Sequence, residues 1–309
     1  MAGAAPTRDG AAAHVHGAGA TCQIASKRNT AAMTQLNVTS KQGARADLIL
    51  TEPPSAHTWL YWCPAMGVTA RQYRVFAEAM AAAGIGVATH EWRGAGSSDQ
   101  RASRRNDWGY RDLLDDIDAG VARLRSARTV GRLLIGGHSL GAQLAALALA
   151  REPALAEAYV LIASGMPWWR SFPRWQQPIL FGVFGGFRLL SALCGWFPGR
   201  RVGFAGDEAR GVVDDWARSG SSGRYRVAGL ELDFDAALAR VNVPAWAAHL
   251  EHDRFAPLSS TTELQSRLPL ARWQTEHYTA AQFAAKQATH FSWMKEPGPI
   301  VARLREWIG

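Results

Sequence analysis

Apolar and polar positions begin to alternate regularly at about residue 34, and the pattern first predicts three β-strands. Segments 35–40 and 44–51 have strand character and are separated by a turn that contains Gly43. The third strand, Thr58–Cys63 (TWLYWC), is fully apolar and ends at the breaker cluster Pro64–Gly67. The two strands that precede the first helix predict an antiparallel start to a sheet.

Helices and strands then alternate along most of the remaining chain. Apolar spacing predicts helices over 71–83, 106–125, 139–150, 258–268 and 300–308, and strands over 85–91, 132–136, 158–163, 244–250 and 272–277. Strands that alternate with helices form βαβ units, which build a mostly parallel sheet with helices on both faces. The pattern therefore predicts an α/β fold with an eight-stranded sheet.

A segment rich in Trp, Phe, Gly and Pro interrupts this alternation between residues 165 and 240. An insertion after the sixth strand is typical of a cap domain, so we expect a core over 34–164 and 241–309 with the cap between them. Within the cap, the apolar run Pro178–Pro198 contains Arg188 and barely reaches the ~20 residues needed to span a bilayer. We expect a buried pair of cap helices and no transmembrane span, with contact at a membrane surface as the alternative.

Residues 1–33 show no periodic apolar pattern and are rich in Ala, Gly, Thr and Ser. Charged residues interrupt the segment and no continuous apolar region is present, so a disordered tail is expected and not a signal peptide. Met33 is an alternative start of translation. Two histidines of this tail, His14 and His16, lack the further ligands that a metal site requires.

Composition and charge change this picture little. The chain is 48% hydrophobic and 19% charged, which is an ordinary globular balance. Cys22, Cys63 and Cys194 form no C-x-x-C pair, which argues against a disulfide framework or a zinc site and favours the cytoplasm. Although the net charge is +8, the arginines are scattered and no DNA-binding motif accompanies them. We expect no nucleic-acid partner and at most weak contact with a membrane surface.

The strongest chemical signal is the G-x-S-x-G sequence of Gly137-His138-Ser139-Leu140-Gly141. An apolar strand (LLIGG) leads into it and an Ala- and Leu-rich helix (AQLAALALA) follows, which is the context of a nucleophile elbow. The serine hydroxyl stands clear of the sheet at such a turn, above a helix N-terminus that favours developing negative charge. The motif predicts an α/β-hydrolase fold with Ser139 as nucleophile.

A serine nucleophile needs a base, and in this fold the acid and the histidine follow the serine along the chain. Asp253 comes directly after the predicted strand 244–250 and is the expected acid, with Glu251 as a less favoured substitute. His290 lies between the last strand and the last helix and is the expected base. Its competitor, His277, falls at the edge of a predicted strand.

Acyl transfer also needs donors for the developing oxyanion and a surface that binds substrate. We expect the backbone N–H groups of Leu140 and Met66 to form the oxyanion hole. The pocket should be apolar, as ligand pockets usually are. The cap aromatics expected to bind substrate are Trp168, Trp169, Phe184 and Trp196. No cofactor and no metal are expected.

Several motifs together resemble a bacterial family of predicted α/β-hydrolases that is similar to serine aminopeptidases and monoglyceride lipases. The resemblance covers about residues 34–309. It rests on Pro64-Ala65-Met66-Gly67-Val68, Trp92-Arg93-Gly94, Gly137-His138-Ser139, Ser164-Gly165, Trp196-Phe197-Pro198-Gly199 and Thr289-His290-Phe291. The resemblance implies the fold and the triad but no substrate. The chain departs from the family pattern at Glu91, Ala142 and Ser292.

These observations predict a serine hydrolase that cleaves a carboxylic ester or thioester with an apolar acyl or alcohol part. Such a protein would act on a small molecule. Two alternatives stay open. A peptidase or amidase of the same fold would use a cap carboxylate for the substrate N-terminus, the candidates being Asp207, Glu208, Asp214 and Asp215. A noncatalytic ligand-binding protein would have kept only the fold.

Overall fold

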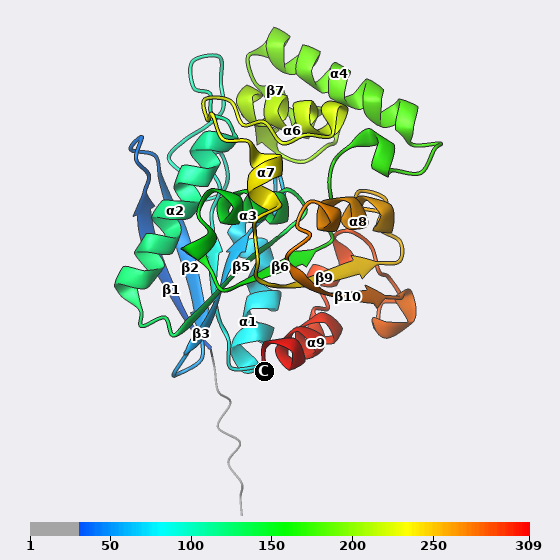
Figure 1. The fold of residues 1–309 in the computed structure, drawn as a ribbon. Helices are drawn as coiled ribbons and strands as arrows, with labels where there is room; N and C mark the ends of the chain where they lie inside the picture. The colour runs from blue at the N-terminus through cyan, green and yellow to red at the C-terminus, as the bar shows by residue number, and fades with distance from the viewer. Residues whose placement is uncertain (1–30) are drawn as a thin grey trace, which may run out of the picture.

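The computed structural model describes residues 31–309, and its centre is an eight-stranded β-sheet in the order β1-β2-β4-β3-β5-β6-β9-β10 (Figure 1). The pairs β1–β2 and β2–β4 are antiparallel, and every other neighbouring pair is parallel. The predicted fold class is therefore confirmed. The strands are β1 (Ala32–Thr39), β2 (Arg45–Glu52), β3 (Thr58–Cys63), β4 (Gly86–His90), β5 (Arg132–His138), β6 (Ala158–Ile162), β9 (Pro244–Leu250) and β10 (Arg272–Tyr278).

Helices cover both faces of the sheet, and each face has its own apolar core. On one face, α1 (Arg74–Ala82) and α9 (Gly298–Ile308) contribute Phe76, Met80 and Leu304 to a common cluster. On the other face lie α2 (Tyr110–Ala127), α3 (Leu140–Arg151) and α8 (Leu258–Ser266). Short 3-10 turns at 70–73, 153–155, 169–171, 280–282 and 292–294 join these elements.

Helix α3 runs through the centre of the molecule. Its residues 140–150 are all buried, which explains why the sequence there is almost purely Ala and Leu. The helix begins directly after Ser139 at the end of β5, so the buried strand and the buried helix together hold the serine in place. Gln143 is the polar exception within this apolar run.

The segment between β6 and β9 carries the elements of the expected cap: α4 (Gln177–Cys194), β7 (Phe197–Pro198), α5 (Gly199–Val202), β8 (Asp207–Glu208) and α6 (Arg210–Ser222). Strands β7 and β8 pair with each other apart from the main sheet. Figure 1 shows α4 and α6 side by side above the C-terminal ends of the parallel strands. The following helix, α7 (Phe234–Leu238), packs on α3 and joins the core instead, through Phe234 and Leu238.

Two sequence predictions need correction. The run 178–198 does not form a buried helix pair, because it contains the single long helix α4, of which only Phe184 and Ser191 are buried. The expected tail over 1–33 lies mostly outside the described residues, as do His14, His16 and Cys22. Its last two residues, Ala32 and Met33, begin β1, because they pair with Glu52 and Thr51 of β2.

Candidate active site

Ser139 occupies the sharp turn between β5 and α3. Its backbone has φ 53° and ψ −122°, a left-handed conformation that is strained for a residue with a side chain. The backbone is held from both sides, because its N–H donates to the carbonyl oxygen of Ile162 (3.3 Å) and its carbonyl oxygen accepts from Oγ of Ser164 (2.6 Å). This strain is the geometry of a nucleophile elbow.

The carboxylate of Asp253 and the imidazole of His290 form a buried pair. Nδ1 of His290 lies 2.8 Å from Oδ2 and 3.0 Å from Oδ1 of Asp253. The backbone N–H groups of Phe255 and Ala256 also donate to Oδ1, each at 2.9 Å. A carboxylate held by these donors keeps the Nδ1 proton of the imidazole in place, which leaves Nε2 free to accept a proton.

The competing acid and base lie elsewhere. Glu251 is exposed, and its carboxylate accepts from the backbone N–H of Ala280 at 2.8 Å. His277 is exposed on β10, where its ring lies beside that of His249 at 5.6 Å. The structure therefore brings Asp253 and His290 together and separates the two alternatives from them.

The loop after β3 carries the expected oxyanion donor Met66 and is fixed by side chains that the sequence reasoning did not single out. The N–H of Ala65 donates to the hydroxyl of Tyr73 (2.8 Å), which lies 2.9 Å from Nδ1 of His138. Burial lowers the pKa of His138, and the nearby His290 lowers it further, so His138 is neutral. The loop is thus connected to the residue that precedes the serine.

The same loop is also held from the cap side. The backbone of Gly67 lies so close to Ala205 and Gly206 that a Cβ atom at position 67 would overlap them, and its φ is 72°. Burial raises the pKa of the Glu208 carboxyl to about 8, and the nearby backbone N–H of Gly67 partly offsets the rise. No group within residues 31–309 accepts a hydrogen bond from the N–H of Met66 or of Leu140. Both donors are therefore available.

Ser139 and His290 open onto one cavity of about 380 Å³ between the core and the cap. Met66 and Leu140, the expected oxyanion residues, also line it. Most of the remaining wall is apolar, from Leu180, Val183, Phe184, Phe187, Phe204 and Trp216. Arg254 and His290 are the charged or titratable side chains of this wall within residues 31–309. The size and lining fit a small molecule with an apolar part.

Of the four cap aromatics expected at the substrate, Phe184 lines the cavity and the three tryptophans do not. Trp168 lies against Gly223, and Nε1 of Trp169 donates to the carbonyl oxygen of Ser221 at 3.2 Å. Trp196 is half-buried before β7, away from the cavity. The residues of α4 that line the cavity are at positions 180, 183, 184 and 187, which is the spacing of one helix face. This spacing was the signal in the sequence that could have identified the cavity-lining residues.

Gln143 is a cavity residue that the sequence reasoning missed. The side chain is 6% exposed, and its Oε1 atom has no hydrogen-bond partner within the described part of the chain. An unpaired buried amide oxygen is costly unless a ligand or water satisfies it. The signal in the sequence was a lone polar residue in an otherwise apolar helix.

The cap carboxylates considered for a substrate N-terminus have other partners. Asp207 accepts from the N–H of Arg200 (3.3 Å), Asp214 pairs with Arg188 (3.1 Å) and Asp215 accepts from the N–H of Tyr110 (2.9 Å). None of them, nor Glu208, lines the cavity.

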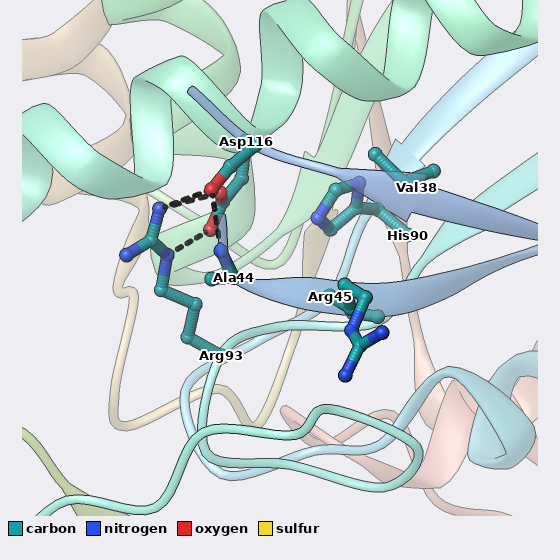
Figure 2. A pocket seen from close by; sticks show the side chains of 8 residues that line it. Val38, Ala44, Arg45, His90, Arg93 and Asp116 are labelled. Carbon is teal, nitrogen blue, oxygen red and sulfur yellow. Dashed lines mark hydrogen bonds and ion pairs between the residues drawn. The ribbon is translucent and has the colours of Figure 1, made fainter. Parts of the chain in front are cut away.

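A second, much smaller hollow of about 10 Å³ lies between the β1–β2 hairpin and α2 (Figure 2). The guanidinium of Arg93 bonds both carboxylate oxygens of Asp116, at 2.6 and 2.8 Å, and both side chains are 7% exposed. His90 also faces this hollow. The Arg-Gly turn after β4 is thereby tied to α2, so this group is a structural bridge between sheet and helix.

No group of three or more potential metal ligands occurs in residues 31–309.

The strand order gives this chain the α/β-hydrolase fold. Residues 54–192 match the family model described as serine aminopeptidase, S33, which confirms the resemblance inferred from the motifs. This stretch includes the loop that carries Met66, the elbow and most of α4. No curated protein gives a match to the chain.

Solved structures of esterases share the fold along nearly the whole chain. The Pyrococcus furiosus esterase Pf2001 is 14% identical, with a TM-score of 0.58 over 90% of this chain and 91% of that one. Est1E from Butyrivibrio proteoclasticus, with ferulic acid bound, is 13% identical, with a TM-score of 0.60 over 87% and 97%. The thioesterase domain from the curacin biosynthetic pathway is 14% identical, with a TM-score of 0.57 over 89% and 99%.

Proposed function

We propose that this chain is a serine hydrolase of carboxylic esters or thioesters whose acyl or alcohol part is apolar. The observation that carries the proposal is the shared cavity, onto which the strained Ser139 and the Asp253-paired His290 both open. The esterase and thioesterase neighbours support the same reaction class.

The reaction follows from the placement of these groups. His290 takes the proton of the Ser139 hydroxyl while the oxygen attacks the carbonyl carbon, and the N–H groups of Leu140 and Met66 bind the resulting oxyanion. Collapse expels the alcohol or thiol, which receives the proton from His290, and leaves an acyl-enzyme on Ser139. A water molecule then loses a proton to His290 and attacks the acyl carbon. The bond between this carbon and the Ser139 oxygen breaks, His290 returns the proton to that oxygen, and the acid leaves.

The cavity wall favours an ester over a peptide with a free N-terminus. An ammonium group would need a carboxylate in the wall, and the wall formed by the described residues has none while it carries Arg254. The phenyl and alkyl side chains suit an acyl chain or an aryl group instead. The peptidase reading would be favoured if amino-acid arylamides were hydrolysed faster than matched esters.

Labelling with a fluorophosphonate probe tests the nucleophile. We expect wild-type protein to label and Ser139→Ala not to label, with Ser55→Ala, an exposed serine in the turn between β2 and β3, as a control that keeps the nucleophile. A series of p-nitrophenyl esters of increasing acyl length then tests the substrate class, and turnover should rise with length until the cavity is filled. Wild-type protein that never labels and hydrolyses no ester of the series would support the noncatalytic alternative.

A further inference from the structure

Helix α4 has two apolar faces, of which only one is covered. Within residues 31–309 it is the one helix long and apolar enough to cross a membrane, yet 16 of its 18 residues are not buried. The covered face lines the cavity through Leu180, Val183 and Phe187. The helix therefore cannot be a core helix, whose apolar residues would be buried all round.

The uncovered face is a continuous stripe, which we call the outer stripe: Ile179, Gly182, Gly186, Leu189 and Leu193 of α4, continued by Trp175 in the turn just before the helix. These positions are three or four residues apart, so they lie on one side of a helix. Trp175, Ile179, Leu189 and Leu193 are between 58% and 64% exposed, and Phe181 beside them is 56% exposed. Figure 1 places α4 at the outer edge of the cap, with α6 between it and the core.

All charged residues of the sequence segment that carries the outer stripe are arginines. From Ala158 to Gly206 the sequence contains five arginines (Arg170, Arg174, Arg188, Arg200 and Arg201) and no Asp or Glu. All five are exposed, and Arg188 and Arg200 are partly neutralised by Asp214 and Asp207. An apolar face with basic flanks fits an anionic lipid surface, because the apolar side chains enter the acyl region while the guanidinium groups remain at the phosphates.

The contacts of the inner face decide between lying on a membrane and spanning it. The ring of Phe184 packs on Trp216 of α6 at 4.8 Å, and Arg188 pairs with Asp214 at 3.1 Å. A spanning α4 would have to break these contacts and open the cavity. A second copy of the chain is the less favoured occupant, because it would bring a second set of arginines to the same face.

We propose that the outer stripe of α4 docks on an anionic lipid surface and brings the cavity to the interface, where apolar esters reside. The part concerning the substrate rests on the proposed ester hydrolysis, whereas the docking does not. In this arrangement one face of α4 contacts lipid and the opposite face lines the cavity. A substrate acyl chain that moves from the lipid surface into the cavity therefore travels a distance of about one helix diameter.

Binding to vesicles tests the docking. Wild-type protein should co-sediment with phosphatidylcholine vesicles that contain about one-third phosphatidylglycerol, and less with phosphatidylcholine alone. Ile179→Glu/Leu189→Glu should lower the vesicle partition coefficient about tenfold or more, since it places two charges in the acyl region. Leu270→Glu is the matched control, because Leu270 is 53% exposed just before the N-terminal end of β10, whereas α4 lies above the C-terminal ends of the parallel strands, and binding should be unchanged.

A second variant addresses the charges. Arg170→Gln/Arg174→Gln should weaken binding to the anionic vesicles about tenfold, weaken the dependence on salt and leave binding to neutral vesicles as it was. The proposal would be overturned if wild-type protein stayed in the supernatant, or if the Glu double variant bound vesicles as strongly as wild type. A wild-type dimer that becomes monomeric in the Glu double variant would assign the stripe to a second copy instead.

Activity separates this proposal from the proposed function. The Glu double variant should hydrolyse a water-soluble short-chain ester at the wild-type rate and an ester carried in anionic vesicles about tenfold more slowly, in line with its binding. Ser139→Ala should bind vesicles like wild type. If no ester is hydrolysed but vesicle binding behaves as described, the docking stands and the ester assignment fails.

Discussion

Gly141, in the first turn of α3, lies directly against the carbonyl oxygen of Cys63 at the end of β3. A Cβ atom at position 141 would overlap both this oxygen and that of Pro64, which are backbone atoms of the strand and of the loop that carries Met66. The second glycine of the elbow therefore keeps the serine and this loop at contact distance.

Replacement of this glycine should affect stability and activity together. We expect Gly141→Ala to lower the free energy of unfolding by about 1–3 kcal/mol, because backbone must move to admit the methyl group. Labelling of Ser139 by the fluorophosphonate probe should also slow. Urea unfolding measures the first effect. Gly185→Ala is the control, since space is open at Gly185 and alanine in an exposed helix should stabilise by up to about 1 kcal/mol.

Asp253→Asn tests the pairing with His290. An amide at this position accepts less well from Nδ1–H and favours the wrong tautomer of the imidazole, so kcat should fall about 10³- to 10⁴-fold. Ester hydrolysis at a fixed pH measures the effect. Asp99→Asn alters an exposed carboxylate that pairs with Arg45, and it should leave kcat unchanged. A loss below about tenfold in Asp253→Asn would contradict the role assigned to Asp253.

Gln143→Leu separates stability from recognition. The Oε1 atom of Gln143 is buried without a partner, so its removal should raise the free energy of unfolding by about 1 kcal/mol. If the amide binds a polar group of the substrate, kcat/KM should fall for esters that carry a hydroxyl or amide and stay constant for plain alkyl esters. If urea unfolding instead shows a lower free energy of unfolding for Gln143→Leu, the amide of Gln143 has hydrogen-bond partners in the free protein.

The carboxyl of Glu208 should make stability depend on pH. Burial raises its pKa to about 8, above the ordinary value of 4.5, so the folded protein holds a proton that the unfolded chain releases between these values. The unfolded state binds fewer protons there, and stability from this group is therefore lost as pH rises from about 4.5 to about 8. Glu208→Gln should abolish this part of the slope, measured as the difference in urea unfolding between pH 5 and pH 8.

The bridge between Arg93 and Asp116 predicts a large loss when it is broken from one side. Arg93→Met leaves a buried carboxylate without its partner and should cost about 3–5 kcal/mol. Burial already raises the pKa of Asp116 to about 6 against the opposing effect of Arg93, and without Arg93 it should rise further. The loss should accordingly be greater at pH 8 than at pH 5. Arg93→Met/Asp116→Leu, which removes both charges, should recover most of the stability.

Apolar periodicity was enough to predict the order of the strands and helices in the core, because it reports which side of each element is buried. The elbow around Ser139 was equally clear, since the turn, the glycines and the flanking apolar segments are all local. The chain order of serine, acid and histidine then selected Asp253 and His290, which the structure holds 2.8 Å apart although 37 residues separate them.

Tertiary structure alone decided which face of each apolar segment is covered. The spacing of α4 is the same whether its outer stripe is buried or bare, so composition could not tell a buried helix pair from an exposed helix. Likewise, the raised pKa of Glu208 and the unpaired Oε1 of Gln143 depend on neighbours from distant segments. Periodicity shows whether a residue is apolar or polar, whereas packing between distant segments determines which residues it contacts.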